Sequence, residues 1–273
     1  MADLKGKIAL VTNASCDVGG GMAQGLAEAG ATIYLADSRL SSQHQSEPST
    51  LEATAARVEQ LGGQAIIHIL EPDDGAASAL FERIAAEQGA LDLLVNNGCQ
   101  FSADQPSDLP FWQRPLSVWD DHCGAALRGA YVAAVKAADM MVAAKRGLIV
   151  NVFCRNAAED SRDIGRGVAE VGYDRIARDI ARALSPHQVT ALALRTGPIA
   201  TPPVLTGIAS GTPQADSAHT QSPRFVGRCL AALAMDPDIA EKTGGSYSVA
   251  ALAAEYRFSE PDQHRSTQDP EHD

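Results

Sequence analysis

Short apolar runs alternate along the chain with longer segments in which apolar residues recur at helical spacing. Seven short runs, most of them largely apolar, predict strands, at residues 8–12, 32–36, 64–70, 91–95, 147–152, 189–194 and 245–249. The segments between them predict helices, at residues 22–29, 51–61, 76–88, 118–143, 166–184 and 224–235. Strands that alternate with helices are joined by right-handed crossovers and lie parallel. The pattern therefore predicts an α/β fold, a single doubly wound (Rossmann-type) domain with a seven-stranded parallel sheet.

The chain shows no internal repeat and no linker, so we expect one domain over residues 1–259. Residues 41–50 are polar and lengthen the connection after the second strand. Residues 202–222 are rich in Pro, Gly, Ser and Thr and predict a surface loop. Residues 260–273 are polar and charged without periodicity, which predicts a flexible acidic tail.

Composition and charge exclude several classes of protein. Against 34 acidic residues the chain has 22 Lys and Arg, and a net charge of −12 with no basic patch argues against nucleic-acid binding. The first apolar segment is too short for a signal peptide or a membrane span, so we expect a cytoplasmic protein that binds no membrane. Five cysteines without a Cys-x-x-Cys pair, and scattered histidines, predict no metal site.

The turn after the first predicted strand reads Thr-Asn-Ala-Ser-Cys-Asp-Val-Gly-Gly-Gly from residue 12. In parallel sheets ligands bind beyond the carboxyl ends of the strands, and a glycine-rich turn lets the backbone approach a pyrophosphate. Gly19 is present in this turn, but Asn13 and Asp17 stand where such a turn has its first two glycines. Asn tolerates the left-handed region, whereas Asp17 adds a negative charge near the phosphates.

The turn resembles the Thr-Gly-x-x-x-Gly-x-Gly motif of the short-chain dehydrogenase/reductase family, and the resemblance covers nearly the whole chain. Asn96-Asn97-Gly98-Cys99 is similar to the family's Asn-Asn-Ala-Gly, and Gly197 and Thr201 fit its Pro-Gly-x-x-x-Thr. The resemblance implies an oxidoreductase with NADP or NAD as cofactor, a small-molecule substrate and a substrate lid at about residues 202–222. It also implies a homodimer or homotetramer built on the helices at 118–143 and 166–184.

The resemblance assigns the cofactor-binding residues. Asp37 would hold the adenosine ribose hydroxyls, which favours NAD as the cofactor. Arg39, two residues later, leaves NADP as the alternative cofactor. Glu71 stands where an acid meets the adenine amine. The full set that the resemblance implies is Asn13, Ser15, Asp17, Val18, Gly19, Asp37, Ser38, Arg39, Glu71, Asn97, Gly98, Gly197, Ile199 and Thr201.

The chain departs from the family at the proton relay, an Asn, Ser, Tyr and Lys set in which Lys lowers the Tyr pKa. Arg166 and Glu170 stand at the Tyr and Lys positions, and Cys154 and Ala126 at the Ser and Asn positions. Arg166 is a poor proton donor because the pKa of arginine lies above about 12. Three interpretations stay open: a non-catalytic NAD(P)-binding pseudoenzyme, a carbonyl reductase with substitute residues, and a reductase whose substrate needs no relay.

The third interpretation has a chemical motive, because hydride transfer to an iminium cation discharges a positive charge and needs no acid. The chain is also similar to fungal members of this family in secondary metabolism, which reduce an iminium and guide an intramolecular Diels-Alder cyclisation to bicyclic diazaoctane indole alkaloids. Those Diels-Alderases lack the Tyr-Lys pair and use an Asp and an Arg at the places of Asp163 and Arg128. The candidate catalytic residues are Asp163, Arg128, Arg166, Glu170 and Cys154.

The aromatic residues near the predicted start of the long helix are further candidates. Phe111 and Trp112, in a loop flanked by Pro, are expected to line a pocket. Trp119 and Tyr131 are expected in the core or in a pocket wall.

Overall fold

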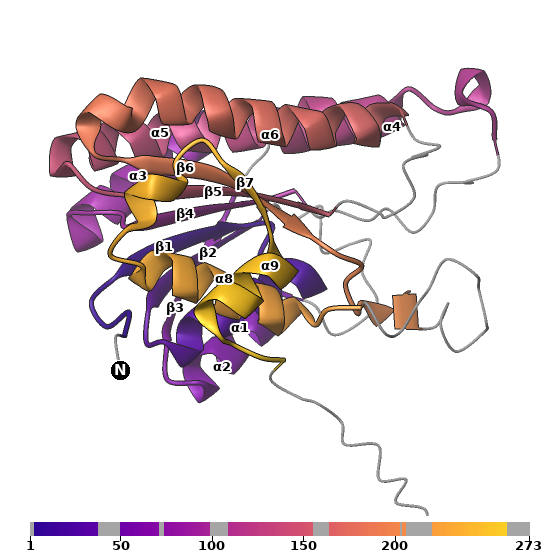
Figure 1. Ribbon diagram of the computed structural model, residues 1–273. Coiled ribbons are helices and arrows are strands. Elements are labelled where there is room, and N and C mark those ends of the chain that lie inside the picture. The colour runs from indigo at the N-terminus through magenta and orange to yellow at the C-terminus, as the bar shows by residue number, and fades with distance from the viewer. Residues whose placement is uncertain are drawn as a thin grey trace, which may run out of the picture.

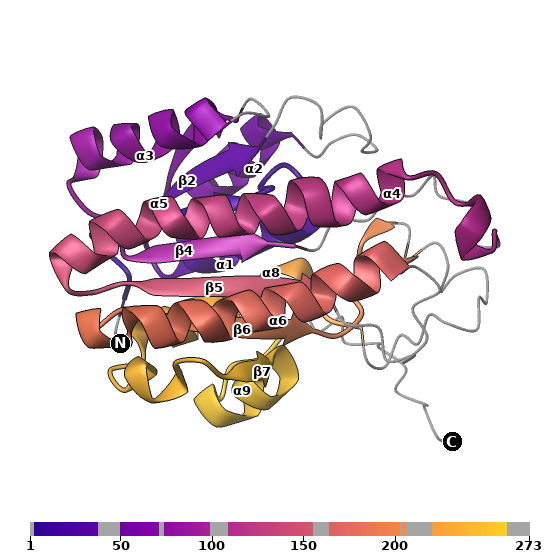
Figure 2. The same cartoon turned by 90° about the horizontal axis from the view of Figure 1, so that it is seen from above.

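Seven parallel strands form one sheet in the order β3-β2-β1-β4-β5-β6-β7 in the computed structural model (Figures 1 and 2). It describes residues 3–37, 50–70, 74–98, 109–154, 164–202, 204–205 and 220–260. The strands are β1 Ile8–Thr12, β2 Thr32–Asp37, β3 Gln64–Ile69, β4 Leu93–Asn97, β5 Leu148–Cys154, β6 Thr190–Thr196 and β7 Ser246–Ser248. The predicted fold class is confirmed, and every strand boundary lies within two residues of its prediction.

Helices cover both faces of the sheet because its central strands are apolar on both sides. One face carries α1 Asp17–Glu28, α2 Leu51–Gln60, α8 Pro223–Met235 and α9 Val249–Tyr256 (Figure 1). The other carries α3 Asp74–Gln88, α5 Arg128–Ala144 and α6 Ile164–Leu184 (Figure 2). Short helical turns lie at Phe111–Gln113, Ser185–His187 and Ile239–Lys242. The helix α9 has no counterpart among the predicted elements.

The single helix predicted at residues 118–143 is wrong in its first part. The short helix α4 Ser117–Trp119 leads into a π-helix at Asp120–Leu127, and only then does α5 begin. This π-helix packs against the start of α6: the Cys123 thiol lies 3.5 Å from the Gly165 carbonyl oxygen, and a Cβ on Gly172 would lie 2.6 Å from the Leu127 side chain. The wider π-helical turn packs closely on α6 because Gly172 has no side chain where Leu127 approaches.

The helices α1 and α8 approach each other more closely than side chains would allow. A Cβ on Gly25 would lie 2.3 Å from the Gly227 carbonyl carbon, and one on Gly227 would lie 2.6 Å from the Met22 oxygen. Glu28, near the end of α1, accepts hydrogen bonds from Arg224 and Arg228 of α8. Small residues and an ion pair therefore join the first and last long helices of the domain.

The folded domain extends through Glu260, which the sequence assigns to the tail. The Glu260 carboxylate accepts hydrogen bonds from the Ser222 amide and hydroxyl, at 3.0 and 2.5 Å. The Phe258 ring packs against Phe225, with the centroids 5.0 Å apart. These contacts hold the start of α8, while residues 261–273 lie outside the described part of the chain. Over the described ranges, no helix has the length and apolar character that crossing a membrane requires.

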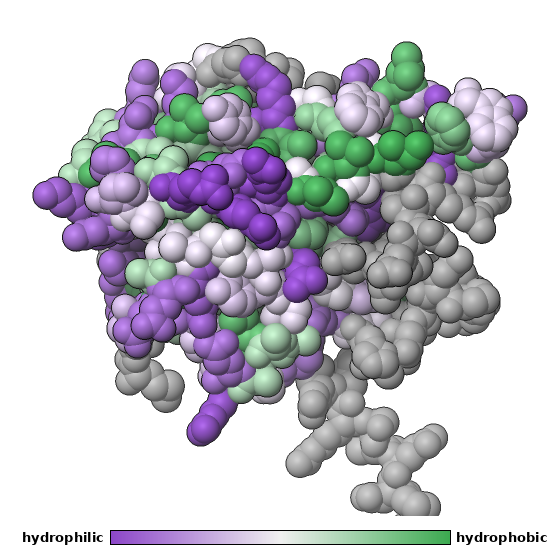
Figure 3. Space-filling view, turned by 45° about the horizontal axis from the view of Figure 1, so that its top comes forward, coloured by the Kyte–Doolittle hydropathy of each residue, from purple (hydrophilic) through white to green (hydrophobic). Residues whose placement is uncertain are grey.

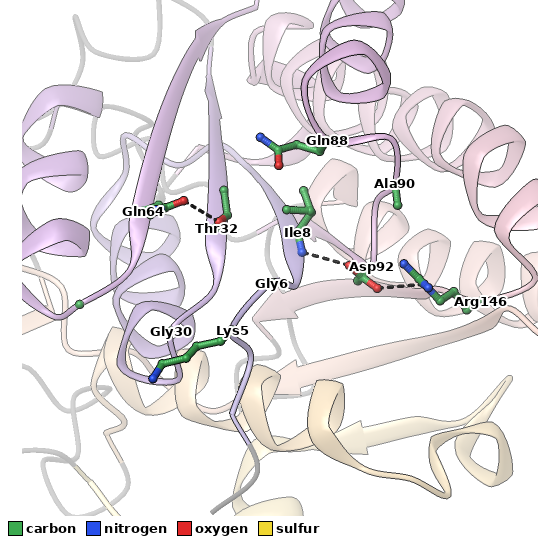
Figure 4. A pocket seen from close by; sticks show the side chains of 11 residues that line it. Lys5, Gly6, Ile8, Gly30, Thr32, Gln64, Gln88, Ala90, Asp92 and Arg146 are labelled. Atoms are coloured by element: carbon green, nitrogen blue, oxygen red, sulfur yellow. Dashed lines mark hydrogen bonds and ion pairs between the residues drawn. The ribbon is translucent and has the colours of Figure 1, made fainter.

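A cavity of about 570 Å³ opens at the amino edge of the sheet, opposite the carboxyl ends of the strands (Figure 4). Its main charged group is Asp92, which accepts from the Ile8 amide at 3.1 Å and pairs with Lys7 at 3.1 Å and Arg146 at 3.2 Å. Asp92 thus has partners from three directions. At this cavity the Asp92 carboxylate links the starts of strands β1 and β4 to Arg146, just before β5.

Candidate active site

The turn between β1 and α1 keeps a tight backbone although two of its glycines are replaced. Asn13 has a φ of 51°, in the left-handed region, as its place in the turn predicts. Its side-chain amide donates to the Asn97 carbonyl oxygen at 2.7 Å, so it also ties the turn to β4. Gly19 is required here, because a Cβ would lie 2.2 Å from the Asn13 oxygen.

Cys16 caps α1, a role that was not predicted. Its sulfur accepts a hydrogen bond from the Gly19 amide at 3.2 Å and donates to the Asn13 oxygen at 3.0 Å. The Asn97 side chain donates to the same sulfur at 3.2 Å. Burial raises the pKa of Cys16 to about 11, so the thiol keeps the proton that it donates. The signal in the sequence is its position directly before the first helical residue, where a side-chain acceptor is favoured.

Asp37 lies at the carboxyl end of β2, where the sequence analysis places the acid that holds a ribose. Its side chain is buried and accepts from the Ser15 amide at 2.9 Å and the Ser15 hydroxyl at 2.5 Å. This links the end of β2 to the turn after β1. Asp17 is the first residue of α1, and Val18 behind it is buried. The other predicted residues of the adenosine end, Ser38, Arg39 and Glu71, lie outside the described residues.

Three candidate catalytic residues meet at the carboxyl end of β5. The Arg166 Nε lies 3.0 Å from a Glu170 carboxylate oxygen, and the guanidinium donates to the Cys154 carbonyl oxygen at 3.4 Å. The side chains of Arg166 and Glu170 are 22% and 19% exposed. Burial raises the pKa of Cys154, although the Thr196 hydroxyl and Arg166 act against it. Cys154 is thus a buried thiol rather than a nucleophilic thiolate.

The segment from Gly197 to Thr201, which follows β6, is held by Gln221. The Gly197 amide donates to the Gln221 side-chain oxygen at 3.2 Å. The Gln221 amide donates to the Pro198 oxygen, and the Ala200 amide donates to the Gln221 oxygen, both at 2.8 Å. The predicted residues Ile199 and Thr201 are buried within this pairing. Gln221 itself was not predicted, since no local pattern pairs it with residues more than 20 positions earlier.

Asn97 and Gly98, at the carboxyl end of β4, connect this strand to β5 beside the site. The Gly98 amide donates to the Val152 oxygen at 2.8 Å, and a Cβ on Gly98 would lie 2.4 Å from the Tyr173 ring. Tyr173 is buried and stacks on Phe153, 6.2 Å between centroids. Tyr173 therefore packs in the core beneath the site.

The remaining predicted residues divide between the surface and the undescribed part of the chain. Arg128 begins α5 and is exposed, and Asp163 lies outside the described residues. The expectation that Trp119 and Tyr131 are in the core is wrong, because they are 48% and 53% exposed, and their alternative place in a pocket wall stays a prediction. Phe111 and Trp112, also exposed, meet edge to face at 5.4 Å on the segment that projects beyond α4 (Figure 2).

The described residues fit a dinucleotide with one local conflict. In a doubly wound sheet the turn after β1 and the acid after β2 serve the first mononucleotide, and the ends of β4, β5 and β6 serve the second. The left-handed Asn13, the N-terminus of α1 and the carboxylate of Asp37 suit pyrophosphate and ribose. The carboxylate of Asp17 conflicts with a pyrophosphate. Among the described residues, no group of three or more His, Cys, Asp and Glu side chains could hold a metal ion.

Comparisons with known proteins agree with this geometry. The model of the family described as short chain dehydrogenase matches residues 7–206. Dehydrogenase/reductase SDR family member 1 of Mus musculus is 34% identical over 276 residues, covering 96% of this chain and 85% of the mouse protein. The structure of NAD+-bound xylitol dehydrogenase is similar with a TM-score of 0.73 at 19% identity, over 90% of this chain and 98% of that one. A metagenomic short-chain oxidoreductase in complex with NADP gives 0.66 at 23% identity, over 86% and 93%.

Proposed function

Because the chain belongs to the short-chain dehydrogenase family, whose members are oxidoreductases that use NAD or NADP, we propose that it reduces an activated C=N bond, an iminium, in a small-molecule secondary metabolite. The nicotinamide cofactor supplies the hydride when bound. Asn13, Ser15 and Asp37 would hold its adenosine end, and the residues at the ends of β4, β5 and β6 its nicotinamide end.

The loss of the tyrosine proton donor, whose position Arg166 holds, carries this proposal. A ketone becomes an alkoxide when it is reduced and must then be protonated, whereas an iminium becomes a neutral amine. An arginine guanidinium is a poor general acid. The raised pKa of Cys154 makes its thiol a poor donor as well. A substrate that needs no proton suits the chemistry of these described residues.

We expect Asp163→Asn to lower kcat/KM on a cyclic iminium by about 10- to 100-fold, because the carboxylate would stabilise the cationic substrate. Binding of NADH should stay unchanged. Turnover is followed by nicotinamide absorbance with cyclic iminium ions and with matched ketones. Glu82→Gln, an exposed change on α3, is the control. Equal turnover by Asp163→Asn would remove this residue from the mechanism.

A carbonyl reductase is the second candidate, because a fixed guanidinium beside Cys154 would stabilise an alkoxide until water protonates it. Turnover of ketones but not of iminium ions would favour it.

A pseudoenzyme would bind NADH and reduce neither class. The resemblance also implies an intramolecular Diels-Alder cyclisation, which would use Arg128 and Asp163. Its test is to incubate the protein with a compound that carries both a diene and a dienophile and to analyse the products for the cyclised compound.

We expect Asp17→Gly to raise the affinity for NADH by about tenfold, since the substitution removes a carboxylate from the pyrophosphate end of the site. Calorimetric titration with NADH measures this change. Asp3→Asn, far from the turn, should leave the dissociation constant unchanged. Weaker binding by Asp17→Gly would show that the carboxylate assists the dinucleotide.

We also propose that the protein forms a homodimer or homotetramer through α5 and α6. The outer faces of these helices expose Tyr131, Val135, Val168 and Val171, and apolar side chains gather there in Figure 3. Val171→Asp is expected to shift the protein to monomers in light scattering, whereas Val171→Ala should not. A monomeric starting protein would contradict this assignment.

A further inference from the structure

The Arg166–Glu170 pair differs from the other ion pairs on its helix. Its side chains are 22% and 19% exposed, whereas those of Arg175 and Asp179, at the same spacing on α6, are 71% and 45% exposed. The stability gained from an exposed pair at this spacing is small. Because the pair is partly buried at the carboxyl end of β5, water screens the charges of Arg166 and Glu170 less, and these charges interact more strongly with a ligand that binds there.

The position of the Arg166–Glu170 pair on the sheet indicates which part of the cofactor lies beside it. Asp37 and the turn after β1 occupy the first mononucleotide half, and Arg166 contacts the end of β5, in the second half. On the proposed function, the nicotinamide ring is the part of the cofactor that binds in this second half. This ring carries a positive charge in NAD+ and none in NADH, while the other charges of the two forms are the same.

We propose that the Arg166–Glu170 pair sets the preference of the site between oxidised and reduced cofactor. The Glu170 carboxylate offsets the charge of the Arg166 guanidinium, so that the pair as a whole carries no net charge toward the cationic ring of NAD+. Each partner alone would shift the preference, and in opposite directions. Glu170 without its charge would leave Arg166 to repel NAD+, and Arg166 without its charge would leave Glu170 to attract it.

The test is the ratio of the dissociation constants of NAD+ and NADH, measured by calorimetry for four proteins and one control. We expect Glu170→Gln to raise this ratio about tenfold and Arg166→Gln to lower it by a similar factor. The double variant should return close to the starting ratio. Asp179→Asn, from the exposed pair, should leave the ratio unchanged.

ADP-ribose, which lacks the nicotinamide ring, separates this effect from general damage to the site. Its affinity should be equal in all five proteins, and circular dichroism checks that each is folded. Single variants that shift the ratio in the same direction, or by less than about twofold, would overturn the inference while leaving the proposed function intact. A starting protein that binds neither dinucleotide would overturn both.

Discussion

Replacing Gly25 with valine is expected to destabilise the protein by about 3 kcal/mol or more, enough to lower Tm by roughly 10 °C or to abolish the folded state. The reason is the contact between α1 and α8. A Cβ on Gly25 would lie 2.3 Å from one backbone atom of α8 and 2.4 Å from another, at Gly227 and Arg228. Backbone atoms cannot rotate away as a side chain can, so the two helices would have to separate.

Thermal unfolding followed by circular dichroism measures this loss. Gly129→Ala is the matched control, because Gly129 also lies in a long helix and a Cβ there would meet nothing within 4 Å. We expect Gly129→Ala to be neutral or to stabilise the protein by up to about 1 kcal/mol. A Gly25→Val protein with the starting Tm would show that α1 and α8 can move apart at no cost.

Asp37→Ser is expected to weaken NADH binding by about 100-fold. The carboxylate would accept hydrogen bonds from the ribose hydroxyls, and each bond to a charged acceptor contributes about 1.5–3 kcal/mol. NADPH should bind more tightly to Asp37→Ser than to the starting protein, because its additional phosphate would no longer meet the carboxylate. Titration with both cofactors measures the two changes.

The same substitution also affects the fold, because the amide and hydroxyl of Ser15 lose their shared acceptor. We expect a loss of about 1–2 kcal/mol, which thermal unfolding measures separately from binding. Ser15→Ala removes the hydroxyl but keeps the carboxylate, so its NADH affinity should fall far less. An unchanged ratio of NADH to NADPH affinity in Asp37→Ser would place the ribose elsewhere.

The fold was predictable because its signals are local. The central strands are built largely of aliphatic residues, and the left-handed conformation of Asn13 follows from its place in a turn that usually holds glycine. The meeting of Cys154, Arg166 and Glu170 was also predictable in outline. Arg166 and Glu170 are four residues apart on one helix, and that helix starts beside the end of β5.

The features that could not be predicted from the sequence depend on contacts between distant segments of the chain, or on which neighbouring element covers a helix. Gln221 pairs with Gly197 across a long connection, and Gly25 meets Gly227 from the other end of the chain. Trp119 and Tyr131 were expected in the core or in a pocket wall, and both are exposed. Helical spacing marks an apolar face but does not say whether this chain or another one buries it. The π-helix packs closely on α6 at Gly172, a contact that its own sequence does not reveal.

The glycine contact between α1 and α8 also constrains the order of events during synthesis. Gly25 is made early, but its partner Gly227 is made some 200 residues later, when most of the chain has left the ribosome. Until then α1 has no α8 to pack against, and the cost of closing so long a loop is met only at the end. The surface of α1 around Gly25 is therefore uncovered by α8 for most of the synthesis of the chain. The helix α8, made late, thus completes a contact that α1, the first helix of the chain, leaves open.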